Sequence, residues 1–179
     1  MEVEFTRRAD GGSVAEIARV DGVRLRMRSY DVTNQVPHDA IHLIGERALG
    51  MSDGLFGSIA AGAVFESMEV VGGRQRHDRR QRSEEIRRRH AGSLRLAETL
   101  VGALQGSLDA DAAGAKDRLD AAWGITRTGA SPFSAEQADR AVRELRRLRT
   151  EWAGLAVGGP GVRYTWPEPA GRRRPRGSN

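Results

Sequence analysis

The sequence predicts an α+β fold in which a small antiparallel sheet is followed by mostly helical packing. Two observations lead to this expectation. Apolar and polar residues alternate through much of the first 29 residues, which is the period of a half-buried strand. Later segments place apolar residues three and four apart and are bounded by capping residues and glycines, which is typical of amphipathic helices. We expect one domain over residues 1–169.

The N-terminal sheet is expected over residues 2–29. Val3 and Phe5 alternate with charged residues, ADGG supplies a turn, and SVAEIARV forms a second strand before the turn at Asp21-Gly22. The third strand alternates three apolar residues with three arginines: Val23, Leu25 and Met27 with Arg24, Arg26 and Arg28. One face of this sheet should therefore be exposed to solvent and basic.

Helices are expected over residues 37–70. Pro37 suits a first helical turn, where its missing N–H has no partner, and the helix should run to about Leu49 and stop at Gly50. A second, glycine-rich helix should follow Ser52 through LFGSIAAGAVFESMEV. Its glycines favour close approach of backbones, so we expect this segment to be tightly packed.

The second half begins with an expected polar linker over residues 72–83, followed by helices over 84–157. Ser83 is expected to cap a long helix, and a shorter helix should end at Gly124. Ser134 and Gln137 have the spacing of a capping box for the last helix. The segment VRYTW, within residues 161–166, alternates like an edge strand and could return to the N-terminal sheet.

Composition limits the chemistry that the chain can perform. There is no cysteine, so disulfides, thiolate ligands and cysteine nucleophiles are excluded, and any metal must be held by His, Asp or Glu. The formal charge is +5, but four arginines lie in the tail at residues 170–179, which we expect to be disordered. No apolar run is long enough to span a membrane or to act as a signal peptide, so we expect a cytoplasmic protein.

The stretch VPHDAIHLIGE carries the strongest candidate site. On a helix, His38, His42 and Glu46 lie within a stripe roughly 80° wide that borders the apolar arc, so the two imidazoles can reach one ion. Three successive turns diverge from a single point, which makes Glu46 a poor ligand beside both histidines. The pattern favours a site for zinc or another divalent metal.

The five residues HDAIH resemble the HExxH signature of the zincin metallopeptidases. That resemblance implies that His38 and His42 bind zinc and that Asp39, which stands where the family has Glu, acts as the acid or base. Asp39 is one methylene shorter than the family's Glu. In the branch whose third ligand is a Glu on a later helix, Glu66 or Glu69 would supply it. The resemblance implies hydrolase chemistry, while the sequence alone leaves enzymatic activity open.

A longer stretch, PHDAIHLIGERALGMSDGLFGSIAAGAVF, resembles a segment of uncharacterised proteins of actinobacterial type. The resemblance covers about a sixth of the chain. It implies kinship and no particular activity.

Three other interpretations stay open. The histidines could simply cap and pack the helix. The protein could also be a non-enzymatic interaction or regulatory protein that contacts nucleic acid through an arginine-rich stretch. The arginines of that stretch are Arg74, Arg76, Arg79, Arg80, Arg87 and Arg88. The apolar stripe of the last helix could also bind a protein partner or a second copy of the chain.

Overall fold

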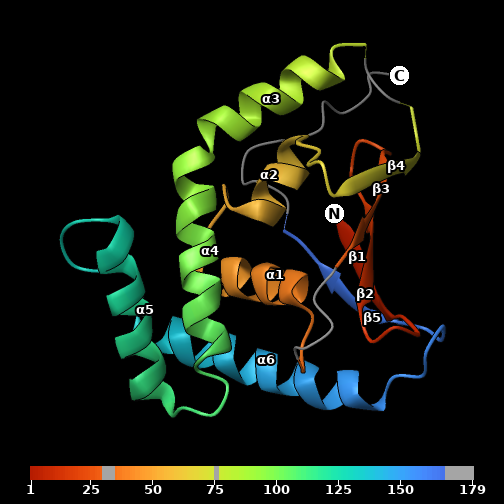
Figure 1. The fold of residues 1–179 in the computed structure, drawn as a ribbon. Helices are drawn as coiled ribbons and strands as arrows, with labels where there is room; N and C mark the ends of the chain where they lie inside the picture. The colour runs from red at the N-terminus through yellow and green to blue at the C-terminus, as the bar shows by residue number, and fades with distance from the viewer. Residues whose placement is uncertain (30–34, 75–76, 168–179) are drawn as a thin grey trace, which may run out of the picture.

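The computed structural model describes residues 1–29, 35–74 and 77–167. Within these residues a five-stranded antiparallel sheet packs against helices, which confirms the α+β class (Figure 1). In chain order the elements are β1 (Glu2–Arg7), β2 (Ser13–Ala18), β3 (Arg24–Arg28), α1 (His38–Leu49), α2 (Leu55–Ala61), β4 (Met68–Gly72), α3 (Arg79–Arg89), α4 (Ala91–Gln105), α5 (Ala112–Thr126), α6 (Ala135–Gly154) and β5 (Val162–Thr165).

The sheet has the strand order β4-β3-β2-β1-β5. The C-terminal strand β5 pairs antiparallel with β1, Val3 lying opposite Tyr164, so the expected return of an edge strand to the N-terminal sheet is confirmed. One face is buried, and its apolar residues include Phe5, Ile17 and Leu25. The other face carries ion pairs such as Arg26 with Glu16 at 3.0 Å. The alternation in the sequence corresponds to these two faces.

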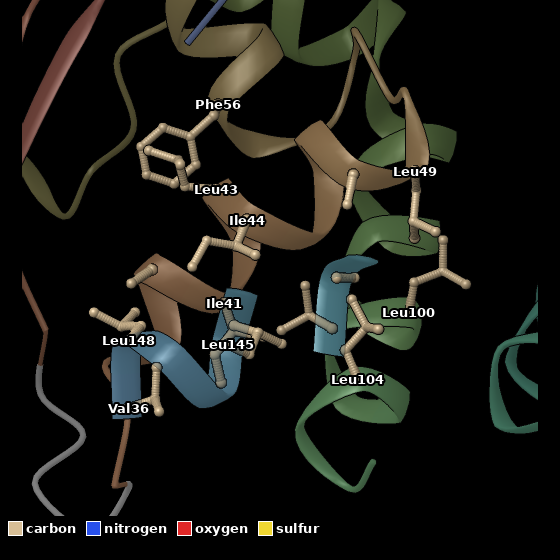
Figure 2. Close-up of a cluster of buried hydrophobic side chains, with 14 of the residues drawn as sticks. Val36, Ile41, Leu43, Ile44, Leu49, Phe56, Leu100, Leu104, Leu145 and Leu148 are labelled. Atoms are coloured by element: carbon tan, nitrogen blue, oxygen red, sulfur yellow. The ribbon is translucent and has the colours of Figure 1, made fainter. Parts of the chain in front are cut away.

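Helix α1 lies at the centre of the molecule, between the sheet and α4, with α6 crossing beside it (Figure 1). Its apolar residues join those of the neighbouring helices in one core (Figure 2). Ile41, Leu43 and Ile44 are completely buried, as are Leu104 of α4 and Leu145 of α6. Each such side chain contributes roughly 1.5–3 kcal/mol of burial free energy, so α1 is firmly anchored in the core.

The structure differs from the expected helix over 37–70 at its C-terminal end. Met68–Gly72 is strand β4, which pairs with β3. Met68, Glu69 and Val70 alternate between apolar and polar, and two β-branched valines follow Glu69. Pairing with an open edge of the sheet outweighs the weak helical signal of this segment. Gly73, at φ +87°, follows the strand, and a Cβ there would lie 2.1 Å from the carbonyl oxygen of Gly22.

The structure also corrects the expected linker over 72–83 and its cap at Ser83. Helix α3 begins at Arg79, before the expected boundary. Ser83 is buried inside that helix, where its Oγ accepts from Val64 N at 2.9 Å and donates to Val64 O at 3.0 Å. The hydroxyl therefore ties α3 to the segment before β4 and does not cap a helix.

Two further outcomes concern the C-terminal part of the chain. The capping box of α6 is confirmed, because Ser134 Oγ accepts from Gln137 N at 3.1 Å while the Gln137 side chain accepts from Ser134 N at 2.8 Å. The expected disordered tail lies outside the described residues.

None of the helices in the described ranges combines the length and the apolar character that crossing a membrane requires.

Candidate metal centre

The two histidines of the HDAIH motif lie at the N-terminal end of α1. His38 is the first residue of the helix, directly after Pro37, and His42 follows one turn later. Their ring centroids are 5.0 Å apart. The expectation that both imidazoles lie on one stripe of a helix is therefore confirmed.

The carboxylate that meets the histidines comes from α4. His42 Nε2 lies 3.4 Å from Glu98 Oε1, and His38 Nε2 lies 3.6 Å from Glu98 Oε2. Ligand atoms from the three side chains lie within 4.8 Å of one another. Tetrahedral zinc with ligands at about 2.0 Å separates neighbouring ligand atoms by about 3.3 Å, so only small side-chain movements separate this arrangement from a coordination sphere.

Close packing of α1 on α4 brings Glu98 to this position. A Cβ on Gly45 would lie only 2.6 Å from Leu104 Cδ1, so the absence of a side chain at Gly45 lets the two helices approach. Leu100 and Leu104 of α4 are buried in the same interface region as Leu49 and Ile41 of α1 (Figure 2). Glu98 then projects from the exposed border of that interface, where its side chain is 64% exposed.

Glu46 holds His42 from the other side. Both side chains are 1% exposed, and Glu46 Oε1 lies 3.1 Å from His42 Nδ1. The same carboxylate accepts from Leu55 N at 2.7 Å and Phe56 N at 3.0 Å, the first backbone N–H groups of α2. Because a carboxylate can only accept, His42 Nδ1 carries a hydrogen and its Nε2 faces Glu98.

Among the described residues, the Nε2 atom of His42 makes no hydrogen bond. It is shielded from solvent and, despite its 3.4 Å distance from Glu98, is not aligned for a hydrogen bond. A buried polar atom without a partner costs free energy, so such atoms are rare in folded proteins. Histidines that bind a metal through one ring nitrogen usually donate the other ring N–H to a nearby carboxylate. Glu46 stands in that relation to His42.

Charge in this cluster is unbalanced without a cation. Burial opposes protonation of His42, but the carboxylates of Glu46 and Glu98 outweigh it and raise its pKa to about 9. His38 and His42 hold the pKa of Glu98 well below its usual range, against a smaller effect of burial. The site therefore favours a positive charge between these side chains, which either a proton or a metal ion can provide.

The other expected ligands do not reach the histidines. Glu69 lies on β4, 3.9 Å from Arg26 on the solvent face of the sheet, and Glu66 is exposed in the turn before that strand. Within the described part of the chain, the cluster able to hold a metal consists of His38, His42 and Glu98. Nothing in the sequence near Glu98 indicated this role, because it depends on how α4 packs against α1.

The remaining candidate residues fall into separate groups. Asp39 is half-buried in the first turn of α1, next to His38. Arg79, Arg80 and Arg87 line a pocket beside β4, whereas Arg74 and Arg88 are exposed and outside it. Arg76 lies outside the described residues. The arginines therefore do not form one uniform surface.

Comparisons with protein-family models, with curated proteins and with solved structures found no match to this chain. The kinship with actinobacterial-type proteins and with zincins therefore stays a prediction from the sequence.

Proposed function

We propose that this protein binds a divalent metal ion through His38, His42 and Glu98 and uses it for hydrolysis. The observation that supports the metal site best is the buried Nε2 of His42, which lacks an aligned hydrogen bond and lies close to a second imidazole and a carboxylate. Two nitrogens and one oxygen form a ligand set that suits zinc and other first-row divalent metals. Glu46 would act as the outer carboxylate that orients His42.

The exposure of the ligands favours a catalytic type of site. His42 is 1% exposed, while the side chains of His38 and Glu98 are 34% and 64% exposed, so the cluster is rigid on its inner side and open on its outer side. Three protein ligands would leave one coordination position open, and a divalent metal held there would supply Lewis-acid chemistry for hydrolysis. Asp39, directly after His38, is the proposed proton acceptor.

The ligand pattern agrees with the zincin resemblance in kind. Two histidines one turn apart on one helix and a Glu from a later helix are the ligand types that the resemblance implies. In this proposal Glu98 is the third metal ligand, in place of Glu66 or Glu69, which the sequence suggested for that role. Asp39 remains the departure from the family pattern, and its role is tested separately from metal binding.

The competing explanation is a structural ion-pair cluster in which a proton on His42 joins α1 to α4. Zinc titration of chelator-treated, untagged protein by calorimetry separates the two. We expect one equivalent of zinc to bind, and Glu98→Gln to weaken binding at least tenfold, since a neutral amide is a poor zinc ligand. The His38→Ala/His42→Ala double variant should not bind.

Glu66→Gln is the matched control, because it makes the same chemical change at an exposed residue outside the cluster. It should bind zinc like the natural chain. Failure of the natural chain to bind one equivalent, or equal affinity of the Glu98→Gln variant, would contradict the metal site.

A further inference from the structure

A second pocket lies between α3 and the segment that leads into β4. Its volume is about 400 Å³, within the lower part of the range for small-molecule sites. Val64 and Val70 form its apolar side, and α3 lines the other with Arg79, Arg80, Ser83, Glu84 and Arg87. The metal cluster lies on α1 and α4, so this pocket is a separate feature of the molecule.

The helical residues of the pocket lie on one face of α3. At about 100° per residue, the five positions cover an arc of about 140°, with Ser83 and Arg87 near its middle. The double hydrogen bond of Ser83 Oγ to Val64 fixes this face against the apolar side. The guanidinium groups are therefore carried by a helix that is tied to the other wall of the pocket.

The three arginines of the pocket have no ion-pair partner in the part of the chain that the structure describes. Within residues 1–29, 35–74 and 77–167, no carboxylate forms an ion pair with Arg79, Arg80 or Arg87. Arg87 Nε is shielded from solvent and finds no hydrogen-bond partner among the described residues. Glu84 is the one acid among the lining residues, so three cations face one anion. An oxygen of a bound ligand would provide the acceptor that this guanidinium nitrogen lacks.

We propose that this pocket binds a small phosphate monoester. The three guanidinium groups would contact the phosphate oxygens, because their planar N–H groups match phosphate geometry. Val64 and Val70 would contact the organic part of the ligand. A concave, partly apolar pocket suits a compact ligand better than a nucleic-acid strand, which needs an extended row of cations and here would lack aromatic stacking residues.

Phenyl phosphate and inorganic phosphate are the probes, measured by calorimetry and by thermal shift at fixed ionic strength with chelator present. We expect phenyl phosphate to bind one equivalent and to bind more tightly than inorganic phosphate, because only the ester reaches the two valines. Arg87→Gln and Arg79→Gln should each weaken phenyl phosphate binding at least tenfold. Because Arg79 is exposed, its replacement keeps the test valid even if the Arg87 variant folds poorly.

Arg88→Gln is the matched control, with the same charge change on the same helix but outside the pocket. Its affinity should stay within twofold of the natural chain. Equal weakening by Arg88→Gln, no binding at millimolar phenyl phosphate, or tighter binding of a short oligonucleotide that depends on Arg88 would each overturn the proposal. Equal affinity for the ester and for inorganic phosphate would overturn the assignment of an organic ligand part.

Discussion

Glu46 and His42 form a buried pair on α1, with Glu46 Oε1 3.1 Å from His42 Nδ1 and both side chains 1% exposed. The same carboxylate accepts from the backbone N–H groups of Leu55 and Phe56. One side chain therefore orients a candidate metal ligand and also satisfies the start of α2. Because three donors converge on this carboxylate, its loss should affect both the stability of the fold and the metal site.

The first prediction concerns Glu46→Gln. The amide offers one acceptor oxygen to three donors and directs an NH₂ group at the others, so a buried hydrogen-bond network is broken. We expect a loss of roughly 3 kcal/mol in the free energy of unfolding, measured by urea denaturation with chelator present. Glu66→Gln, at an exposed position, should change it by less than about 0.5 kcal/mol. A Glu46→Gln variant as stable as the control would contradict the structural role.

The second prediction is the pH dependence of the metal-free protein. The carboxylates of Glu46 and Glu98 overcome burial and raise the pKa of His42 from 6.5 to about 9. The folded state thus binds more protons than the unfolded state between these values, so this contribution is complete below about pH 6.5 and is lost as the pH rises through about 9. We expect the unfolding free energy to fall across that window.

Denaturation of the chelated protein at pH 6, 7.5 and 9 provides the measurement. Other groups also titrate in this range, so His42→Gln is the reference, and the difference in slope between the two proteins isolates His42. Identical slopes would mean that His42 gains no proton on folding. The effect should be moderate, because the exposed carboxylate of Glu98 is partly screened by solvent.

The sequence predicted the parts of the fold that depend on local signals. The alternation of Val23, Leu25 and Met27 led to β3, and the spacing of Ser134 and Gln137 led to the start of α6. Strand β4 was missed because its residues become a strand only by pairing with β3. The prediction that Ser83 caps a helix was wrong for a similar reason. Its hydroxyl forms hydrogen bonds with the backbone of Val64, which is distant in sequence.

The candidate site shows the same division. The spacing of His38 and His42 was sufficient to place two imidazoles on one stripe of a helix. The third member, Glu98, depends on the packing of α4 at Gly45, which no short-range pattern encodes. Helix geometry in the sequence also made Glu46 a poor ligand beside both histidines, and in the structure its carboxylate orients His42.

The third prediction uses the glycine that faces Glu46. Gly54 precedes α2 at φ −73°, so any residue suits its backbone, but a Cβ there would lie 2.4 Å from Glu46 Cδ. Gly54→Ala must displace the carboxylate, and we expect a loss of about 1–3 kcal/mol in unfolding free energy together with weaker zinc binding.

Gly102→Ala in α4 is the matched control, because the residue is helical and nothing lies within 4 Å of the Cβ that alanine would add. Alanine should there stabilise the protein by about 0.5–1 kcal/mol. Opposite signs for the two Gly→Ala changes in urea denaturation would support the tight contact at Gly54. A gain in stability at Gly54 would show that Glu46 moves freely.

The fourth prediction tests Asp39 as the proton acceptor of the proposed hydrolysis. Asp39→Asn keeps the shape of the side chain and removes its basicity, and it leaves all three proposed ligands unchanged. We expect zinc stoichiometry to stay at one equivalent while zinc-dependent hydrolysis of p-nitrophenyl acetate falls roughly 10²-fold, the size of a general-base contribution.

Asp117→Asn on the exposed side of α5 is the control and should leave hydrolysis unchanged. The outcomes separate the two halves of the proposed function. An Asp39→Asn variant that hydrolyses the ester at the natural rate would remove Asp39 from the chemistry. Zinc-loaded protein that is no faster than chelated protein would remove the hydrolase while leaving the metal site, because the ligand geometry of His38, His42 and Glu98 does not depend on a proton acceptor.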